Sequence, residues 1–261
     1  MIIPLKTKQD IQLIKEGGQK LGVVLSQLID MAEPGVNLLE IEKRAVQLIK
    51  EGGGEPGFAR VPGYKWATCL NINEGIVHGI PKDYRLKNGD LLSIDIGNYY
   101  QGWNTDMCAT ILVESPNSKL QITNKKEMTE FLETGKRALE KAIEQARPGN
   151  RVGHMSQKIQ EIIERQGYSC ATNLTGHGVG KKLHESPVIP CLLRGRIEDT
   201  PLLKKGMVIA IEVIYTQGSP ELVVDSDDHW TMKTKDGQPA ALFEKTIAIT
   251  QSGPEIITPF Y

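Results

Sequence analysis

The stretch that decides the fold is LLSIDIGNYYQGWNTDMCATILV, residues 91–113. It predicts two strands joined by a turn that contains Gly97, Asn98 and Gly102. Side chains of a strand alternate between two faces, so the residues on either side of the turn divide into two sets. One set is wholly apolar on the first strand, and the other contains an acid. The stretch therefore predicts a β-hairpin with a polar group on one face.

Two acids in this hairpin need an explanation. Asp95 lies in the middle of the first strand, and Asp106 is expected to open the second. A carboxylate in an apolar strand is costly to bury unless something pairs with it. If the hairpin brings both carboxylates together, both can stay ionised only when a cation lies between them. Two interpretations stay open here: a metal site, or one buried salt bridge beside a turn-capping aspartate.

Composition excludes several classes of protein. The 261-residue chain is 39% hydrophobic and 24% charged with a net charge of -1, as in ordinary soluble globular proteins. Nothing in this charge balance indicates a nucleic-acid site or an anionic membrane surface. No apolar run approaches the roughly 18 residues of a membrane span, and the first residues lack a secretion signal. The four cysteines have no paired spacing, which is typical of a reducing compartment. We expect a cytoplasmic protein without membrane contact.

A repeat organises the rest of the chain. Two segments share one plan of helix end, Pro-Gly, amphipathic helix and glycine: IDMAEPGVNLLEIEKRAVQLIKEGG (29–53) and IEQARPGNRVGHMSQKIQEIIERQG (143–167). Apolar residues at helical spacing predict a longer helix over 7–33 and another over 124–147. We infer a single catalytic domain, 1–261, built from two similar halves of roughly 1–118 and 119–261 that face each other.

The second half supplies two further acids. Glu212 interrupts VIAIEVIY, and Glu244 lies in ALFEKTIAIT. A single acid of this kind is more often a salt-bridged residue at a sheet edge. Four acids isolated in apolar strands, two after each repeat, instead favour an oxygen-rich site for Mn, Fe(II), Co or Zn. His78, His177 and His184 lie in or near glycine-punctuated stretches, and beside four acids they favour a metal-centred catalytic site.

Other chemistries are not indicated. The chain has no GxSxG elbow of a serine hydrolase, and no cysteine has the local signature of a catalytic thiol. GHGVGKK is not a phosphate-binding Walker loop, because Thr175 occupies its first glycine position.

Several motifs in order resemble one known family. They are NEGIVHGIP, IDIG with an Asp eleven residues later, GHGVG with a second His, IEV and FEKTI. Together they resemble the type I methionine aminopeptidases, and the resemblance covers essentially the whole chain. The sequence lacks an N-terminal zinc-binding extension and a long late insertion, so we expect the short bacterial form. The resemblance implies an α+β pita-bread (creatinase/aminopeptidase) fold of two pseudo-symmetric halves, with an antiparallel sheet inside and helices outside.

The resemblance also implies a dinuclear metal site. Its five ligands fall on Asp95, Asp106, His177, Glu212 and Glu244. By this resemblance Asp95 chelates one of two divalent ions, and His177 and Glu212 bind the other. Asp106 and Glu244 bridge the two, and Glu212 doubles as the proton shuttle for a metal-bridging water or hydroxide. The physical chemistry agrees, because two close cations acidify a bridging water and hold a scissile carbonyl.

The substrate expectations rest on the same resemblance. His78 and His184 match histidines that contact the substrate's peptide group and stabilise the tetrahedral intermediate. The implied activity is removal of initiator methionine from nascent chains or peptides with a small second residue. A free amine binds metal only when deprotonated, which ties the reaction to the N-terminal residue.

The methionine pocket implied by the resemblance departs from the family in places. It would be lined by Phe58, Tyr64, Cys69, Leu183 and Trp230. The family usually has other residues at Leu183, Leu174, Met107 and Cys191. We expect that none of these four touches a metal ligand, so that they affect the shape of the pocket and leave the chemistry intact.

Two alternatives and several partners complete the expectations. A prolidase or aminopeptidase P shares the five ligands but usually has an additional N-terminal domain, for which 261 residues leave no room. A non-catalytic binding protein of the same fold predicts a lost ligand, whereas all five are present. The expected partner is a peptide or nascent-chain N-terminus, with the ribosome as a candidate docking partner. A monomer is expected, because no extended apolar surface stretch is apparent.

Overall fold

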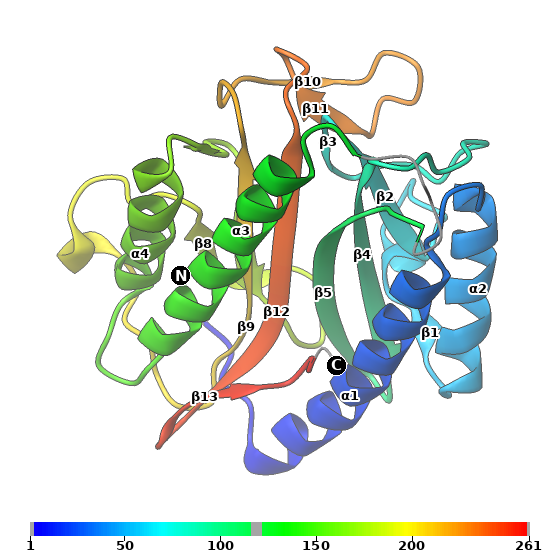
Figure 1. Ribbon diagram of the computed structural model, residues 1–261. Coiled ribbons are helices and arrows are strands. Elements are labelled where there is room, and N and C mark those ends of the chain that lie inside the picture. The colour runs from blue at the N-terminus through cyan, green and yellow to red at the C-terminus, as the bar shows by residue number, and fades with distance from the viewer. Residues whose placement is uncertain (1–2, 116–121, 260–261) are drawn as a thin grey trace.

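The computed structural model describes residues 3–115 and 122–259 and has an α+β fold (Figure 1). Within these residues, four α-helices cover one face of a large antiparallel sheet. The helices are α1 (Lys8–Met31), α2 (Leu38–Glu51), α3 (Lys125–Gln145) and α4 (Val152–Arg165). Helices α1 and α3 confirm the two long helices expected over 7–33 and 124–147. The spacing of their apolar residues explains why each buries one face.

All strand pairs in the described residues are antiparallel. The large sheet has the strand order β1-β4-β5-β12-β9-β7-β8, with β2 on β4, β6 on β9 and β13 on β12. Its strands are β1 (Glu55–Pro56), β2 (Thr68–Ile72), β4 (Leu91–Tyr100), β5 (Trp103–Leu112), β6 (Ser169–Cys170), β7 (Thr175–Gly178), β8 (Glu185–Pro190), β9 (Val208–Thr216), β12 (Ala240–Thr250) and β13 (Gly253–Ile256). A smaller sheet contains β10 (Leu222–Val224), β11 (Met232–Thr234) and β3 (Gly75–Val77).

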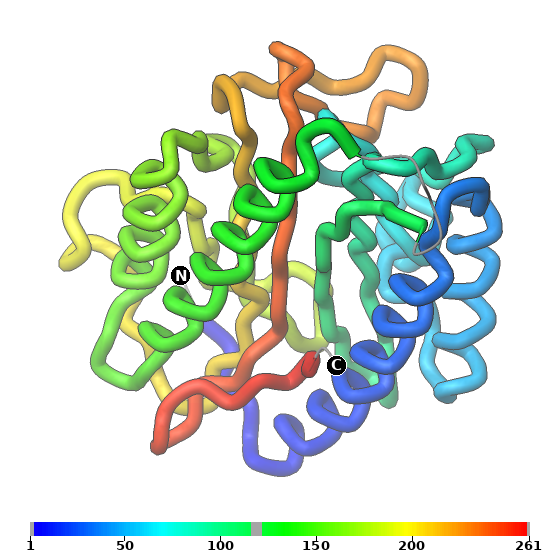
Figure 2. The backbone as a smooth tube through the Cα atoms, in the orientation of Figure 1, coloured from blue at the N-terminus to red at the C-terminus, as the bar shows by residue number. Residues whose placement is uncertain are grey.

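Each helix pair covers its own part of the large sheet. Helix α1 contacts β4 and β5 and packs on α2, whereas α3 contacts β9 and β12 and packs on α4 (Figures 1 and 2). Short 3-10 turns, η1 (Phe58–Arg60) and η2 (Ile197–Asp199), lie in the connections. None of the described helices combines the length and the apolar character that crossing a membrane requires.

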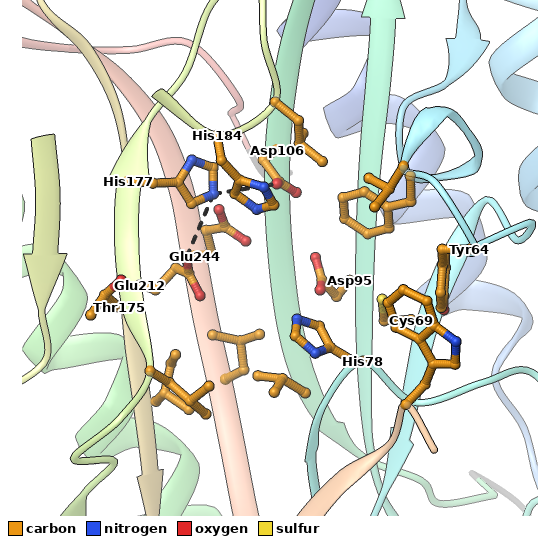
Figure 3. Close-up of a pocket in the computed structure, with 18 residues that line it drawn as sticks. Tyr64, Cys69, His78, Asp95, Asp106, Thr175, His177, His184, Glu212 and Glu244 are labelled. Atoms are coloured by element: carbon orange, nitrogen blue, oxygen red, sulfur yellow. Dashed lines mark ion pairs between the residues drawn. The ribbon is translucent and has the colours of Figure 1, made fainter. Parts of the chain in front are cut away.

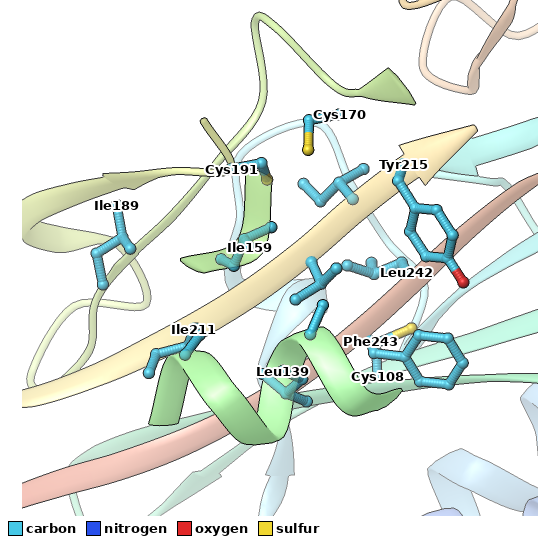
Figure 4. Close-up of a cluster of buried hydrophobic side chains, with 14 of the residues drawn as sticks. Cys108, Leu139, Ile159, Cys170, Ile189, Cys191, Ile211, Tyr215, Leu242 and Phe243 are labelled. Atoms are coloured by element: carbon cyan, nitrogen blue, oxygen red, sulfur yellow. The ribbon is translucent and has the colours of Figure 1, made fainter. Parts of the chain in front are cut away.

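Two large hydrophobic clusters lie between the helices and the sheet. The cluster under α3 and α4 includes Leu139, Ile159, Ile211 and Tyr215 (Figure 4). The Tyr215 ring is fully buried, and its hydroxyl donates to the carbonyl of Phe131 at 2.6 Å. The hydroxyl is therefore satisfied, and burying each large side chain of this kind contributes about 1.5–3 kcal/mol. A second cluster lies under α1 and α2.

The hairpin turn differs from the prediction. Strand β4 continues through Gly97 and Asn98 to Tyr100, and the turn is formed by Gln101 and Gly102, whose φ angles are 48° and 87°. Left-handed φ at both central residues suits a two-residue hairpin turn. Asn98 stays in the strand because its side chain donates to the carbonyl of Gly17 in α1 at 3.0 Å. Placing Gly97 and Asn98 in the turn was therefore wrong.

Candidate active site

Two neighbouring rows of paired residues cross the large sheet and contain every predicted ligand. The first row, from β2 to β9, consists of Cys69, Asp95, Cys108, Glu244 and Glu212. The second row, from β4 to β7, consists of Gly97, Asp106, Thr246, Ala210 and His177. Paired residues of neighbouring strands share a face, and rows two residues apart lie about 7 Å from each other. The hairpin and the second half of the chain thus place their acids on one face.

The two halves meet at a short junction between β5 and β12. The backbones pair at two positions, one of which joins Cys108 to Glu244. Beside it, the Thr246 hydroxyl accepts from the N–H of Asp106 at 3.0 Å and donates to its carbonyl at 2.8 Å. The Thr110 hydroxyl makes the same pair of bonds with the backbone of β12, at 3.0 and 2.8 Å. These hydroxyls satisfy backbone groups of Asp106 and Leu242 at the junction of the two strands.

The His177 imidazole presents a lone pair to the acids. Its Nδ1–H donates to the carbonyl of Gly178 at 2.8 Å, so the neutral ring has an unprotonated Nε2. That Nε2 lies 3.8 Å from Asp106 Oδ2 and 3.7 Å from Glu212 Oε1. Burial, and then the neighbouring His184, lowers the pKa of His177 to about 4, so the ring is neutral at pH 7. A ring nitrogen whose other N–H is held by a carbonyl is the usual form of a metal ligand.

The four acids destabilise one another as carboxylates. Burial raises the pKa of each well above its usual range. Neighbouring charge adds to this effect, because Glu212 raises the pKa of Asp95, Asp95 that of Asp106, and Asp106 that of Glu212 and Glu244. Among the described residues, Asp95 Oδ1, Asp106 Oδ1 and Glu244 Oε1 are buried without a hydrogen-bond partner. Such oxygens are costly unless something outside the chain binds them.

A divalent cation fits this donor set. Ligand atoms of Asp106, His177 and Glu244 lie within 4.8 Å of one another, and all three residues are buried. Carboxylate oxygens with one imidazole nitrogen suit hard or borderline divalent ions. The alternative of a turn-capping aspartate is wrong, because Asp106 is the fourth residue of β5 rather than its first and shares a face with the other acids. Divalent-metal use is therefore indicated by the residues themselves.

Two further histidines face the cavity from opposite sides (Figure 3). His78 follows β3 with a left-handed φ of 58°, and its loop is held by the N–H of Gly79, which donates to Asn71 Oδ1 at 2.8 Å. The His184 ring lies edge-on to the His177 ring, with centroids 4.3 Å apart. Burial lowers the pKa of both His78 and His184, and His184 lowers that of His78 further. Both rings are therefore neutral hydrogen-bonding groups near pH 7.

An apolar recess adjoins the acids. Its core residues are Phe58, Tyr64 and Cys69, against which Leu183 and Trp230 pack. The Tyr64 and Trp230 rings meet edge-on at 5.2 Å, and the Tyr64 hydroxyl donates to the carbonyl of Thr68 at 2.7 Å. Gly97 makes room for the recess, since a Cβ there would lie 2.7 Å from the Phe58 ring. Such aromatic and sulfur-containing walls suit a flexible apolar side chain.

The residues that depart from the family pattern fall into two groups. Leu174 and Leu183 line the cavity, whereas Met107 and Cys191 pack in the hydrophobic clusters. The Cys191 thiol donates to the carbonyl of Glu212 at 3.5 Å. The expectation that none of the four touches a predicted ligand is therefore wrong for Cys191. Only the two leucines bear directly on the shape of the pocket.

One cavity of about 230 Å³ unites these features (Figure 3). Every residue predicted for the site lines it. Sequence reasoning missed five further lining residues: Val61, Val77, Thr175, Ile214 and Leu242. Ile214 and Leu242 each lie two positions from a predicted ligand on the same strand, so strand alternation could have identified them. Val61 lies in a loop and has no periodic signal.

Comparisons with known proteins agree with this geometry. The sequence model described as metallopeptidase family M24 matches residues 12–251. The methionine aminopeptidase of Aquifex aeolicus is 37% identical, over 99% of this chain and 99% of that protein. The crystal structure of methionine aminopeptidase from Thermotoga maritima matches with a TM-score of 0.91 and 36% identity, covering 98% of this chain and 99% of that chain. Prolidase from Pyrococcus furiosus gives a TM-score of 0.77 and 27% identity, covering 98% of this chain and 66% of that chain.

Proposed function

Because this chain belongs to metallopeptidase family M24, we propose that it removes the initiator methionine from nascent proteins and peptides with a small second residue. It is a metal-dependent aminopeptidase with the pita-bread fold. Identity to a named methionine aminopeptidase extends over 99% of both chains, whereas likeness to prolidase covers 66% of that enzyme. Neither a prolidase-like specificity nor a non-catalytic binding protein is favoured.

The observation that carries the proposal is the meeting of two unlike surfaces in one cavity. The acids and His177 form a polar floor, and Phe58, Tyr64 and Trp230 form an apolar recess beside it. A flexible apolar side chain can enter the recess while the adjoining backbone lies over the acids. This arrangement suits an N-terminal methionine whose peptide bond is to be cleaved.

The ligand roles are proposed for Asp95, Asp106, His177, Glu212 and Glu244. Three observations support these roles. The residues lie on one face of two adjacent rows, and carboxylate oxygens among them have no hydrogen-bond partner. The Nε2 of His177 is unprotonated and faces the acids. We propose that these five residues would hold two divalent ions, and this donor chemistry would accept Mn, Fe(II), Co or Zn. When bound, such a pair of ions supplies an acidified water and polarises the scissile carbonyl.

The side chains divide the remaining work. Glu212 faces the cavity, and its carboxylate is placed to accept a proton and to return it to the leaving amine. His78 and His184 approach from opposite sides as neutral imidazoles. Each can donate an N–H to the substrate's peptide group without adding charge to the site, and such donors stabilise the negative charge that develops on the carbonyl oxygen. Leu183 and Trp230 exclude water from the methionine side chain.

Peptide cleavage tests this function directly. Protein stripped by a chelator should be inactive and should regain release of Met from Met-Ala-Ser when Mn, Fe(II) or Co is restored. Leu-Ala-Ser and Ala-Pro should be poor substrates, and Met-Leu-Ser should be cleaved slowly because a bulky second residue crowds the acid-lined floor. Mass spectrometry of the products measures each rate. Equal turnover of Leu-Ala-Ser would implicate Leu174 and Leu183 in a broader pocket, and silence with every metal would refute the proposal.

Metal binding should strengthen as pH rises. Burial and mutual repulsion raise the pKa of all four acids, so protons compete with the cation for them. A raised pKa also means that the metal-free folded state holds more protons than the unfolded state, so its stability falls with rising pH from the ordinary carboxyl pKa of about 4 to the raised value. His177, with its pKa lowered to about 4, has the opposite effect below pH 6.5.

Calorimetric titration with Mn should show proton release, and binding should tighten as the pH rises above the ordinary carboxyl pKa. The Tm of the metal-free protein should fall over the pH range in which the titration shows proton release. Affinity and Tm that do not change with pH would contradict the assignment of these acids as ligands.

Wider context adds four proposals. Each of the four cysteines is free and buried, which supports a cytoplasmic location. The exposed large apolar residues of the described ranges are far apart in sequence, which supports a monomer. The separate clusters under α1–α2 and α3–α4 support one catalytic domain over 1–261 with halves of roughly 1–118 and 119–261. Peptide N-termini are the proposed substrates, and the ribosome is the proposed docking partner during action on nascent chains.

A further inference from the structure

A buried ion pair joins the N-terminal segment to the loop that carries Leu183 and His184. Lys6 Nζ lies 2.6 Å from Glu185 Oε2, and the two side chains are only 3% and 9% exposed. The residues are 179 positions apart in the chain. Burying two charges costs free energy that a well-packed apolar pair would not.

The carboxylate of Glu185, the first residue of β8, contacts the backbone of the loop that precedes this strand. Its second oxygen accepts the N–H of Lys182 at 3.1 Å, which closes the loop around Leu183 and His184. Gly180 lies against the pair, since a Cβ there would be 2.6 Å from Glu185 Oε1 and 2.7 Å from Lys6 Cε. Any shift of the ion pair would therefore move the loop backbone.

Both sides of the loop are anchored to separate parts of the fold. The N–H of Lys6 donates to the carbonyl of Gly206 at 2.7 Å, which holds the N-terminal segment before β9 independently of its side chain. The chain then runs on into α1 (Figure 2). On the opposite side, Asn104 of β5 donates from its N–H and Nδ2 to the carbonyl of Gly180, at 2.8 and 3.0 Å. The loop is thus held between strand β5 and the N-terminal segment.

His184 depends on these anchors for its position. Within residues 3–115 and 122–259, its ring makes no hydrogen bond and contacts the edge of the His177 ring. Its orientation is consequently set by the backbone on which it lies, next to Glu185. We propose that Lys6 and Glu185 are positioning residues, which hold His184 and Leu183 against the substrate through the loop. This inference rests on the proposed methionine aminopeptidase activity.

The first test is Lys6→Met in the full chain, loaded with metal. A small displacement of His184 from its position against the substrate should lower kcat for Met-Ala-Ser by about 10- to 100-fold. Metal affinity should change much less than kcat, because the four acids lie on β4, β5, β9 and β12, outside the loop. Lys15→Met is the matched control. Lys15 Nζ also lies 2.6 Å from a carboxylate, that of Glu255, but these side chains are 34% and 38% exposed and neither residue belongs to the loop.

A second variant separates positioning from folding. Lys6→Met alone leaves a buried carboxylate unpaired and should lower Tm, and Lys6→Met/Glu185→Gln should recover much of that loss. If the pair positions His184, kcat stays low in the double variant. Full recovery of kcat would overturn the inference, because neutralising the buried charge would then be the only role of Lys6.

Histidine NMR gives a readout that does not require activity. The chain has five histidines, so their imidazole signals can be resolved in the zinc-loaded protein. The His184 signal should shift or broaden in both variants, while that of His154 on helix α4 stays fixed. An unchanged His184 signal would also overturn the inference. If the unaltered protein fails to release Met, the proposed function fails, and the NMR arm still decides whether the pair positions His184.

Discussion

Replacement of Glu244 by glutamine is expected to abolish methionine release. Glu244 lies in the row that joins the two halves, and its Oε1 is buried without a hydrogen-bond partner. An amide lacks the negative charge and offers one oxygen in place of two. Mutation of a residue that hydrogen-bonds a metal ligand typically lowers metal affinity by about 10- to 100-fold. Loss of the Glu244 carboxylate itself should lower metal affinity by more than this. Calorimetric titration with Mn and the Met-Ala-Ser assay measure the two losses.

Stability should respond in the opposite sense. In the metal-free protein, Glu244 is raised in pKa by burial and then by Asp106, Glu212 and Asp95. Removing its charge relieves this repulsion, so the free energy of unfolding of metal-free Glu244→Gln should equal or exceed that of the unaltered protein. A large loss of stability with unaffected metal binding would contradict a ligand role.

Glu42→Gln is the matched control. Glu42 is a buried glutamate whose carboxylate accepts the N–H of Ala67 at 2.8 Å and both the N–H and the hydroxyl of Thr68, at 3.0 and 2.7 Å. The same chemical change removes accepted hydrogen bonds here, at a cost of about 1–3 kcal/mol in stability. Metal affinity should not change. Glu244→Gln should thus lose metal affinity and keep its stability, whereas Glu42→Gln should lose stability and keep its metal affinity.

His78→Asn should lower kcat by about 10²–10³-fold, the cost of removing one hydrogen-bond donor to a developing oxyanion. Asparagine is chosen because His78 has a left-handed φ of 58°, a conformation that asparagine tolerates better than alanine. Metal affinity should stay the same, since His78 lies on the loop after β3, across the cavity from His177. Steady-state kinetics with Met-Ala-Ser and Mn titration together distinguish this result from loss of a ligand.

The control for this backbone conformation is His229→Asn. His229 has a φ of 60° and is exposed in the loop before Trp230. If His78→Asn reduces kcat and His229→Asn does not, the effect belongs to the imidazole of His78. Equal rates for the two variants would remove His78 from the proposed mechanism.

The candidate site was predictable from the sequence to an unusual degree. Asp95, Glu212 and Glu244 each interrupt an apolar strand, and a carboxylate in such a place must have a partner. Strand alternation gave the face of Asp95 and of Asp106 within each strand, and the register of the hairpin in the structure puts both on one face. Resemblance then named further site residues, and all of these line one cavity. These signals are local, because they consist of residue types and of the alternation of side chains along single strands.

The errors were also local in origin. Gly97 and Asn98 resemble turn residues, yet both lie inside β4. Gly97 is there because the Phe58 ring approaches its backbone, and Asn98 because its side chain reaches Gly17. Both partners are remote in sequence. Turn propensity describes which backbone conformations a residue can adopt. Tertiary contacts decided that Gly97 and Asn98 adopt the strand conformation.

What the sequence by itself determined is the chemistry of the site and the elements that present it, since periodicity and residue type are properties of short segments. Tertiary structure alone decided how the halves join, through two backbone pairs and the hydroxyls of Thr110 and Thr246. It alone decided that Lys6 reaches Glu185. The physical reason is that register between β5 and β12, and pairing across 179 residues, depend on the packing of the whole chain. No periodic pattern in a single segment records such distances.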